Sequence, residues 1–197
     1  MLDQPLSSLE QRLLEMFSAS LSLGFENVDL IEKLDFFAYF DALTRLPNRN
    51  RFLNEVNEAL FVRQDREQVL VLVDVVCFSE VNEALGVKSG DSLLMLIAKR
   101  LRSAFGGGVK LARVSGDTFG LFGEAKDIDP EAVKRVLEPV FFVHGQALRI
   151  QVRQGIVEVD AKSDGAELLR NAGLALMRAK AMGGGACVRF SAEIFED

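Results

Sequence analysis

The order in which strand-like and helix-like segments follow one another most constrains what this chain can fold into. Between residues 47 and 181, the expected strands are 69–76, 109–114, 118–123 and 147–159, a hairpin turn is expected at 144–146, and the expected helices are 48–62, 79–86, 91–104, 130–138 and 165–181. This order is neither a regular strand–helix–strand series nor an all-strand pattern. We therefore predict an α/β fold: an α+β sandwich of ferredoxin-like type, with a central, mostly antiparallel sheet flanked by helices.

The first 40 residues have a helical pattern of their own, read as one helix or two. In SLEQRLLEMFSASLSLGFENVDLIEKLDFFAYF, residues 8–40, apolar side chains recur at near-helical spacing, at Leu9, Leu13, Leu14, Phe17, Leu21, Phe25, Val28, Ile31 and Leu34. One compact neighbour is too small to cover this stripe, so we expect a linker helix that packs in a homodimer or against a further domain. A helix that folds back onto its own domain is the alternative.

Composition narrows the functions that fit the chain. The 197 residues carry a formal net charge of −6, which argues against nucleic acid as a partner, because phosphate contacts need clustered Lys and Arg. The longest apolar run, 69–78, is too short to span a membrane, and no leader pattern is seen, so a cytoplasmic location is expected. Cys77 and Cys187 lack ligand-spaced partners, which predicts buried thiols rather than a zinc site. His144 is expected to be a surface turn residue.

Two carboxylates are the first candidates for chemistry. Asp74 ends an apolar strand, where a charge is costly unless it is paired, hydrogen-bonded or metal-bound. Asp117 lies at the tip of the hairpin LARVSGDTFGLF, residues 111–122, among small residues. If the two strands are neighbours, both carboxylates meet at one edge of the sheet, and their repulsion favours a bound proton or a divalent cation such as Mg²⁺. A tight turn without chemistry is the alternative.

Four segments give the chain a resemblance to a known family. DALTRLPNR, VLVDVVCFSEVNEALGVKSGD, ARVSGDTFGLF and NAGLALMRAKAMGGG occur in the order and at the spacing of the GGDEF domain of diguanylate cyclases, over roughly residues 41–190. The resemblance implies the nucleotide cyclase or polymerase-palm fold, with the signature, here SGDTF, on a hairpin. It also implies a reaction that joins two GTP molecules into cyclic di-GMP across a dimer interface, with Mg²⁺ or Mn²⁺ at the phosphates.

The resemblance also implies roles for individual residues. Asp74, the carbonyl of Val75 and Asp117 correspond to metal ligands, and Asp117 is the catalytic residue of the signature. The other correspondences are Asn82 and Asp91 for the guanine edge, Lys180 for a phosphate, and Ser115 with Gly116 for the close approach of the bare turn to the phosphates.

Several positions depart from the family pattern, and three of them remove a charge from the expected site. Thr118 stands where the signature has glutamate, Ser79 where a phosphate-contacting lysine is usual, and Gly184 where an arginine joins Lys180. Losing one preorganised charge lowers a rate by about two to three orders of magnitude. We therefore expect cyclase activity to be absent.

The two ends of the chain suggest neighbouring domains, and three hypotheses for the function follow. Residues 1–40 resemble the last helix of a GAF-type sensor domain with its linker, residues 41–190 the GGDEF domain, and residues 191–197 the start of a linker to a following domain such as an EAL phosphodiesterase. The first hypothesis is a degenerate GGDEF domain of a bacterial cyclic di-GMP signalling protein that binds GTP and Mg²⁺ and regulates an attached domain. The second is a structural transmitter without nucleotide, and the third is an active cyclase with an unusual signature.

Overall fold

The computed structural model describes residues 7–62, 66–160 and 163–192, and the chain separates into two compact units, residues 1–38 and 39–197. The first unit contains most of α1 (Ser8–Tyr39), which is one continuous helix. Large apolar side chains are exposed along this helix, among them Phe17 at 65% and Phe25 at 72%. No helix in the described part of the chain combines the length and hydrophobicity that a membrane span requires.

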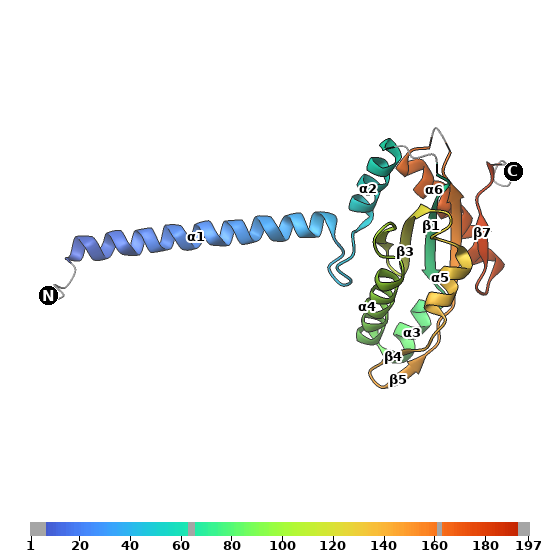
Figure 1. Ribbon diagram of the computed structural model, residues 1–197. Helices are drawn as coiled ribbons and strands as arrows, with labels where there is room; N and C mark the ends of the chain where they lie inside the picture. The colour runs from blue at the N-terminus through green and yellow to red at the C-terminus, as the bar shows by residue number, and fades with distance from the viewer. Residues whose placement is uncertain (1–6, 63–65, 161–162, 193–197) are drawn as a thin grey trace. The chain divides into compact units, whose positions relative to one another are not determined.

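The second unit is built on a five-stranded sheet in the order β2–β3–β1–β6–β7 (Figure 1). Its strands are β1 (Gln68–Val75), β2 (Lys110–Ser115), β3 (Thr118–Glu124), β6 (Val152–Glu158) and β7 (Cys187–Arg189). Neighbouring strands are antiparallel except β6 and β7, which run parallel. A separate hairpin is formed by β4 (Phe141–Val143) and β5 (Gln146–Leu148). The mostly antiparallel sheet flanked by helices confirms the predicted fold class.

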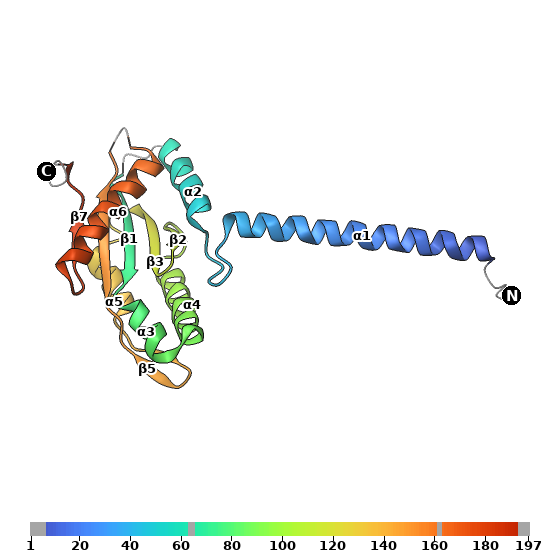
Figure 2. The same cartoon turned by 180° about the vertical axis from the view of Figure 1, so that it is seen from behind.

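Helices cover both faces of this sheet and divide the core in two. They are α2 (Arg49–Phe61), α3 (Phe78–Leu85), α4 (Val87–Ala104), α5 (Pro130–Leu137) and α6 (Gly165–Met182). Figures 1 and 2 show α4 and α5 on one face and α2 and α6 on the other. Along β1 the side chains alternate, so that Leu70 and Leu72 pack on the α2/α6 face and Val71 and Val73 on the α4 face. Asp74 continues the Leu70–Leu72 series and therefore lies on the α6 face.

Helix α6 packs directly against the sheet at Gly155 of β6. A Cβ atom at Gly155 would lie 2.3 Å from the carbonyl oxygen of Ala172 and 2.4 Å from the backbone nitrogen of Leu176. Both are backbone atoms of the helix and cannot move without moving α6, so this position requires glycine. The contact sets the height of α6 above the sheet and, one turn further on, the position of Lys180.

We expect Gly155→Ala to lower the free energy of unfolding by about 2 kcal/mol, because α6 must shift away from the sheet. Gly173 in α6 is the matched control, since an added Cβ atom there meets nothing within 4 Å. Gly173→Ala is expected to raise stability by about 0.5–1 kcal/mol, because alanine is the better helix former. Urea unfolding followed by circular dichroism tests both signs, and a stabilised Gly155→Ala variant would contradict the close packing.

The observed elements differ from the sequence-based expectations in three ways: one strand is divided, one helix begins earlier, and one strand is additional. The expected strand 147–159 is two strands, β5 and β6, because the first part pairs with β4 and the second with β1, and the chain changes sheets at 149–151. The helix expected to begin at residue 91 begins at Val87, directly after Gly86, so Asp91 lies inside α4 rather than at its start. The short strand β7 was not predicted.

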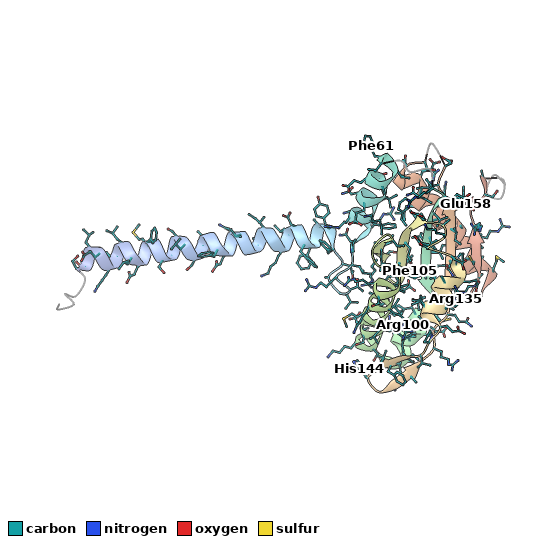
Figure 3. All side chains as sticks on the ribbon, in the orientation of Figure 1. Phe61, Arg100, Phe105, Arg135, His144 and Glu158 are labelled. Carbon is teal, nitrogen blue, oxygen red and sulfur yellow. The ribbon has the colours of Figure 1, made fainter. Side chains whose placement is uncertain are left out.

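Both cysteines are exposed, so the prediction of buried thiols is wrong. Cys77 lies where the chain leaves β1 and enters α3, with φ of 56°, and Cys187 lies in the edge strand β7. His144 is exposed in the β4–β5 turn, as predicted, with φ of 47°. Its Nδ1 and Nε2 atoms lie 3.3 Å from the hydroxyl oxygens of Ser89 and Ser92, which joins the hairpin tip to α4 (Figure 3).

Candidate functional site

The candidate site lies where β1 ends beside the β2–β3 turn. Asp74 is opposite Thr118 in the β1–β3 register, so Gly116 and Asp117 of the turn lie next to the end of β1. The backbone N–H of Val75 donates a hydrogen bond to the carbonyl oxygen of Asp117 at 3.3 Å. The two carboxylates therefore lie at the same end of the sheet, Asp74 near the end of β1 and Asp117 in the neighbouring β2–β3 turn.

The carboxylate of Asp74 is buried, with 2% of its side chain exposed, and has three partners. Lys180 Nζ lies 2.5 Å from Asp74 Oδ1, and Arg153 Nη1 lies 3.6 Å from Asp74 Oδ2. The hydroxyl group of Thr118 donates to Asp74 Oδ1 at 3.3 Å. Since a buried charge without partners is costly, these contacts explain how β1 can end on a carboxylate inside the fold.

The pKa of Asp117 is raised, first by burial and second by the negative charge of Asp74, with Lys180 and Arg113 opposing the shift. The edge therefore holds two mutually repelling carboxylates, and the carbonyl group of Val75 follows directly on the chain. This donor set suits Mg²⁺ or Mn²⁺, which bind one or two protein carboxylates and take other oxygens from phosphates and water. No group of three or more His, Cys, Asp or Glu side chains able to hold a metal ion occurs in the described residues. A cation here would thus depend on ligand oxygens.

Arg113 ties the signature turn to the segment that precedes α2. Its Nε donates to the carbonyl oxygen of Gly116 at 2.7 Å, and its Nη1 lies 3.0 Å and 3.1 Å from the two carboxylate oxygens of Asp41. Burial acts to raise the pKa of Asp41, but hydrogen bonds from Thr44 and Arg113 outweigh it and leave the pKa below its usual value. The carboxylate is therefore held ionised against Arg113. Gly116 itself has φ of 37° and open space where a Cβ atom would be, so the turn is bare as the sequence suggested.

Asn82 of α3 lies against Gly90 of α4, the residue before Asp91. A Cβ atom on Gly90 would lie 1.9 Å from Asn82 Oδ1, so glycine is needed for Asn82 to reach the residue next to Asp91. Asn82 Oδ1 is buried and has no hydrogen-bond partner among the described residues. An unpaired buried acceptor costs about 1–3 kcal/mol, which a donor on a bound molecule would recover. The corner between α3 and α4 therefore contains a buried acceptor that is left unpaired within the described residues.

The positions that depart from the family pattern bring no charge to the site. Ser79 is exposed in the first turn of α3, and Gly184 follows α6 with φ of 57°.

A pocket of about 380 Å³ lies beside Asp74 and its partners Lys180 and Thr118. Its lining includes Arg49, Ser115 and Lys180. The sequence reasoning missed Arg113, which contacts Asp41, and Arg153, which contacts Asp74. The alternation of β6, with Arg153 two residues before Gly155, is the signal for the face on which Arg153 lies.

Curated relatives match the chain over most of its length. The bifunctional diguanylate cyclase/cyclic di-GMP phosphodiesterase MucR of Pseudomonas aeruginosa is 32% identical over 171 residues, covering 82% of this chain and 24% of MucR. Diguanylate cyclase TpbB of the same organism is 31% identical over 176 residues, covering 84% of this chain and 40% of TpbB. The chain spans only about a fifth to a quarter of the first four curated relatives it matches.

Solved structures agree with this relationship. The TpbB GGDEF domain superimposes with a TM-score of 0.72 at 24% identity, covering 81% of this chain and 100% of that one. Diguanylate cyclase SiaD of P. aeruginosa, solved with its activator SiaC, superimposes with a TM-score of 0.70 at 28% identity, covering 91% of this chain and 72% of that one. The family model "Diguanylate cyclase, GGDEF domain" matches residues 38–186. The chain therefore belongs to the GGDEF-domain family of the diguanylate cyclases.

Proposed function

We propose that this chain is a degenerate GGDEF domain of a bacterial cyclic di-GMP signalling protein, which binds GTP with Mg²⁺ or Mn²⁺, has lost most or all cyclase activity, and regulates an attached domain. One observation carries the proposal: Asp74, Asp117 and Lys180 lie together beside the bare signature turn, while Thr118 occupies the glutamate position. The site thus keeps groups that bind a nucleotide and lacks one that would promote its reaction.

Each retained residue has a role in this proposal. Asp74, Asp117 and the carbonyl of Val75 would hold the cation, which supplies charge neutralisation at the phosphates when bound. Asn82 and Asp91 bind the guanine edge, where an amide and a carboxylate match its donor and acceptor pattern. The remaining contacts to the phosphates come from Lys180, Ser115 and Gly116.

The protein is proposed to act in the cytoplasm and to continue into other domains. A GAF-type sensor domain would precede α1 and an EAL phosphodiesterase domain would follow the chain. The name of MucR, a bifunctional cyclase and phosphodiesterase, supports a tandem of this kind. Two copies of the chain are proposed to pair through α1, which the exposed apolar stripe supports.

Calorimetry with GTP and Mg²⁺ tests the nucleotide. We expect binding at millimolar GTP or below, weaker binding of ATP, and a loss of about 10- to 100-fold in GTP affinity for Asp91→Ala, because a hydrogen bond to a charged group is removed. Glu83→Ala is the matched control, since Glu83 is an exposed carboxylate on α3. If no heat is seen at millimolar GTP, the proposal fails.

Two other functions remain in competition. A structural dimerisation module that binds no nucleotide is favoured by the absence of a cation at Ser79 and Gly184, and the same calorimetry decides it. An active cyclase would accumulate cyclic di-GMP from labelled GTP, and Asp117→Ala would then abolish the activity.

A further inference from the structure

Arg153 of β6 lies at Asp74 and has no role in the function proposed above. It is directly opposite Asp74 in the β1–β6 register, and opposed residues of antiparallel strands project from the same face of a sheet. Its side chain is 19% exposed. Arg153 Nε is buried and finds no hydrogen-bond partner in the described residues. Within the described part of the chain, the guanidinium therefore makes one long contact, 3.6 Å from Nη1 to Asp74 Oδ2, and keeps donors unused.

The neighbourhood of Asp74 is consequently not short of positive charge. Lys180 and Arg153 both face one carboxylate, and Lys180 makes the shorter contact, at 2.5 Å. With Asp117 included, two cations stand against two carboxylates. Because Arg153 is held to Asp74 by the longer contact, it is the cation with donors left for a second anion.

The charge of Arg153 also reaches the loop between β1 and α3. The pKa of Cys77 is raised mainly by its hydrogen bond to Glu80, and Arg153 acts in the opposite direction. Cys77 precedes the first turn of α3, where Ser79 replaces a cationic residue. The charge of Arg153 is thus felt both at the buried carboxylate of Asp74 and at Cys77, two residues before Ser79.

We propose that Arg153 is a phosphate-binding residue of this site, whose guanidinium exchanges its long contact with Asp74 for the phosphates of the bound nucleotide. The inference rests on the proposed function. A guanidinium presents donors in a planar fork that matches two phosphate oxygens at once, which a lysine cannot do. Arg153 makes up in this way for the cations absent at Ser79 and Gly184, from a strand on the other side of β1 from the signature hairpin.

The test compares GTP and guanosine binding by Arg153→Ala, Arg153→Lys and the natural chain. We expect Arg153→Ala to bind GTP about 10- to 100-fold more weakly, the loss of a charge-assisted hydrogen bond to an anion. Arg153→Lys should recover part of the loss, since it restores the charge without the fork. Guanosine affinity should not change in either variant. Arg170→Ala is the control, because Arg170 is an exposed arginine on α6 that pairs with Glu167.

The outcomes separate this inference from the proposed function. If the natural chain binds GTP and Arg153→Ala binds it equally well, Arg153 is only a counter-charge for Asp74 and the inference is wrong, whereas GTP binding stands. If Arg153→Ala loses guanosine as well as GTP, the substitution has damaged the whole site and phosphate contact is again contradicted. If the natural chain binds no GTP, both proposals fall.

Discussion

Thr118→Glu is expected to raise cyclic di-GMP synthesis by about two to three orders of magnitude over the natural chain. Thr118 is 7% exposed, begins β3 and already touches Asp74, so a longer acidic side chain at this position reaches the same edge as Asp74 and Asp117. Phosphoryl transfer depends almost wholly on placed charge, so restoring one carboxylate acts directly on the rate. Conversion of labelled GTP, with Mg²⁺ present, measures the effect.

The control for this prediction is Thr118→Gln, which has nearly the size of glutamate without its charge. Its rate should stay at that of the natural chain. The activity of Thr118→Glu should vanish on removal of Mg²⁺, because three carboxylates at one edge repel each other without a cation. Equal rates for Glu and Gln would mean that the missing cations, rather than the missing carboxylate, limit the reaction.

The sequence predicted that Asp74 and Asp117 meet at one end of the sheet, but not that β6 brings Arg153 to Asp74. Asp74 at a strand end and Asp117 in a hairpin were identified from local patterns, and β1 and β3 are indeed neighbours. The position of Arg153 depends on β6 pairing with β1, which no local pattern encodes. The same limit explains why the strand expected at 147–159 was not divided, since one apolar stretch serves two different pairing partners.

The prediction that the cysteine thiols are buried was wrong for a related reason. The apolar run before Cys77 predicts an interior position, but the strand ends at Val75, and two residues later the backbone takes a left-handed conformation that leads into α3. Arg113 was missed because its partner Asp41 is far away in the chain. Through Arg113, the residues just after α1 are connected to the signature turn that carries Asp117.

Removing both cations that face Asp74 is expected to lower the free energy of unfolding by about 3 kcal/mol, in the variant Lys180→Met with Arg153→Met. Asp74 is buried on the sheet, and without these partners the hydroxyl of Thr118 is the one contact left at its carboxylate among the described residues. The estimate is at the low end for a broken buried pair, because Lys180 is 44% exposed and water screens its contact.

Adding Asp74→Asn to this double variant separates charge from packing. The amide removes the buried charge at nearly constant shape. The triple variant should therefore regain most of the lost stability, even though it still lacks the positive charges of Lys180 and Arg153. Urea unfolding at neutral pH compares the three chains. A triple variant as unstable as the double one would show that the methylene stems of Lys180 and Arg153 stabilise the α6 face by packing, and that Asp74 does not depend on its cations.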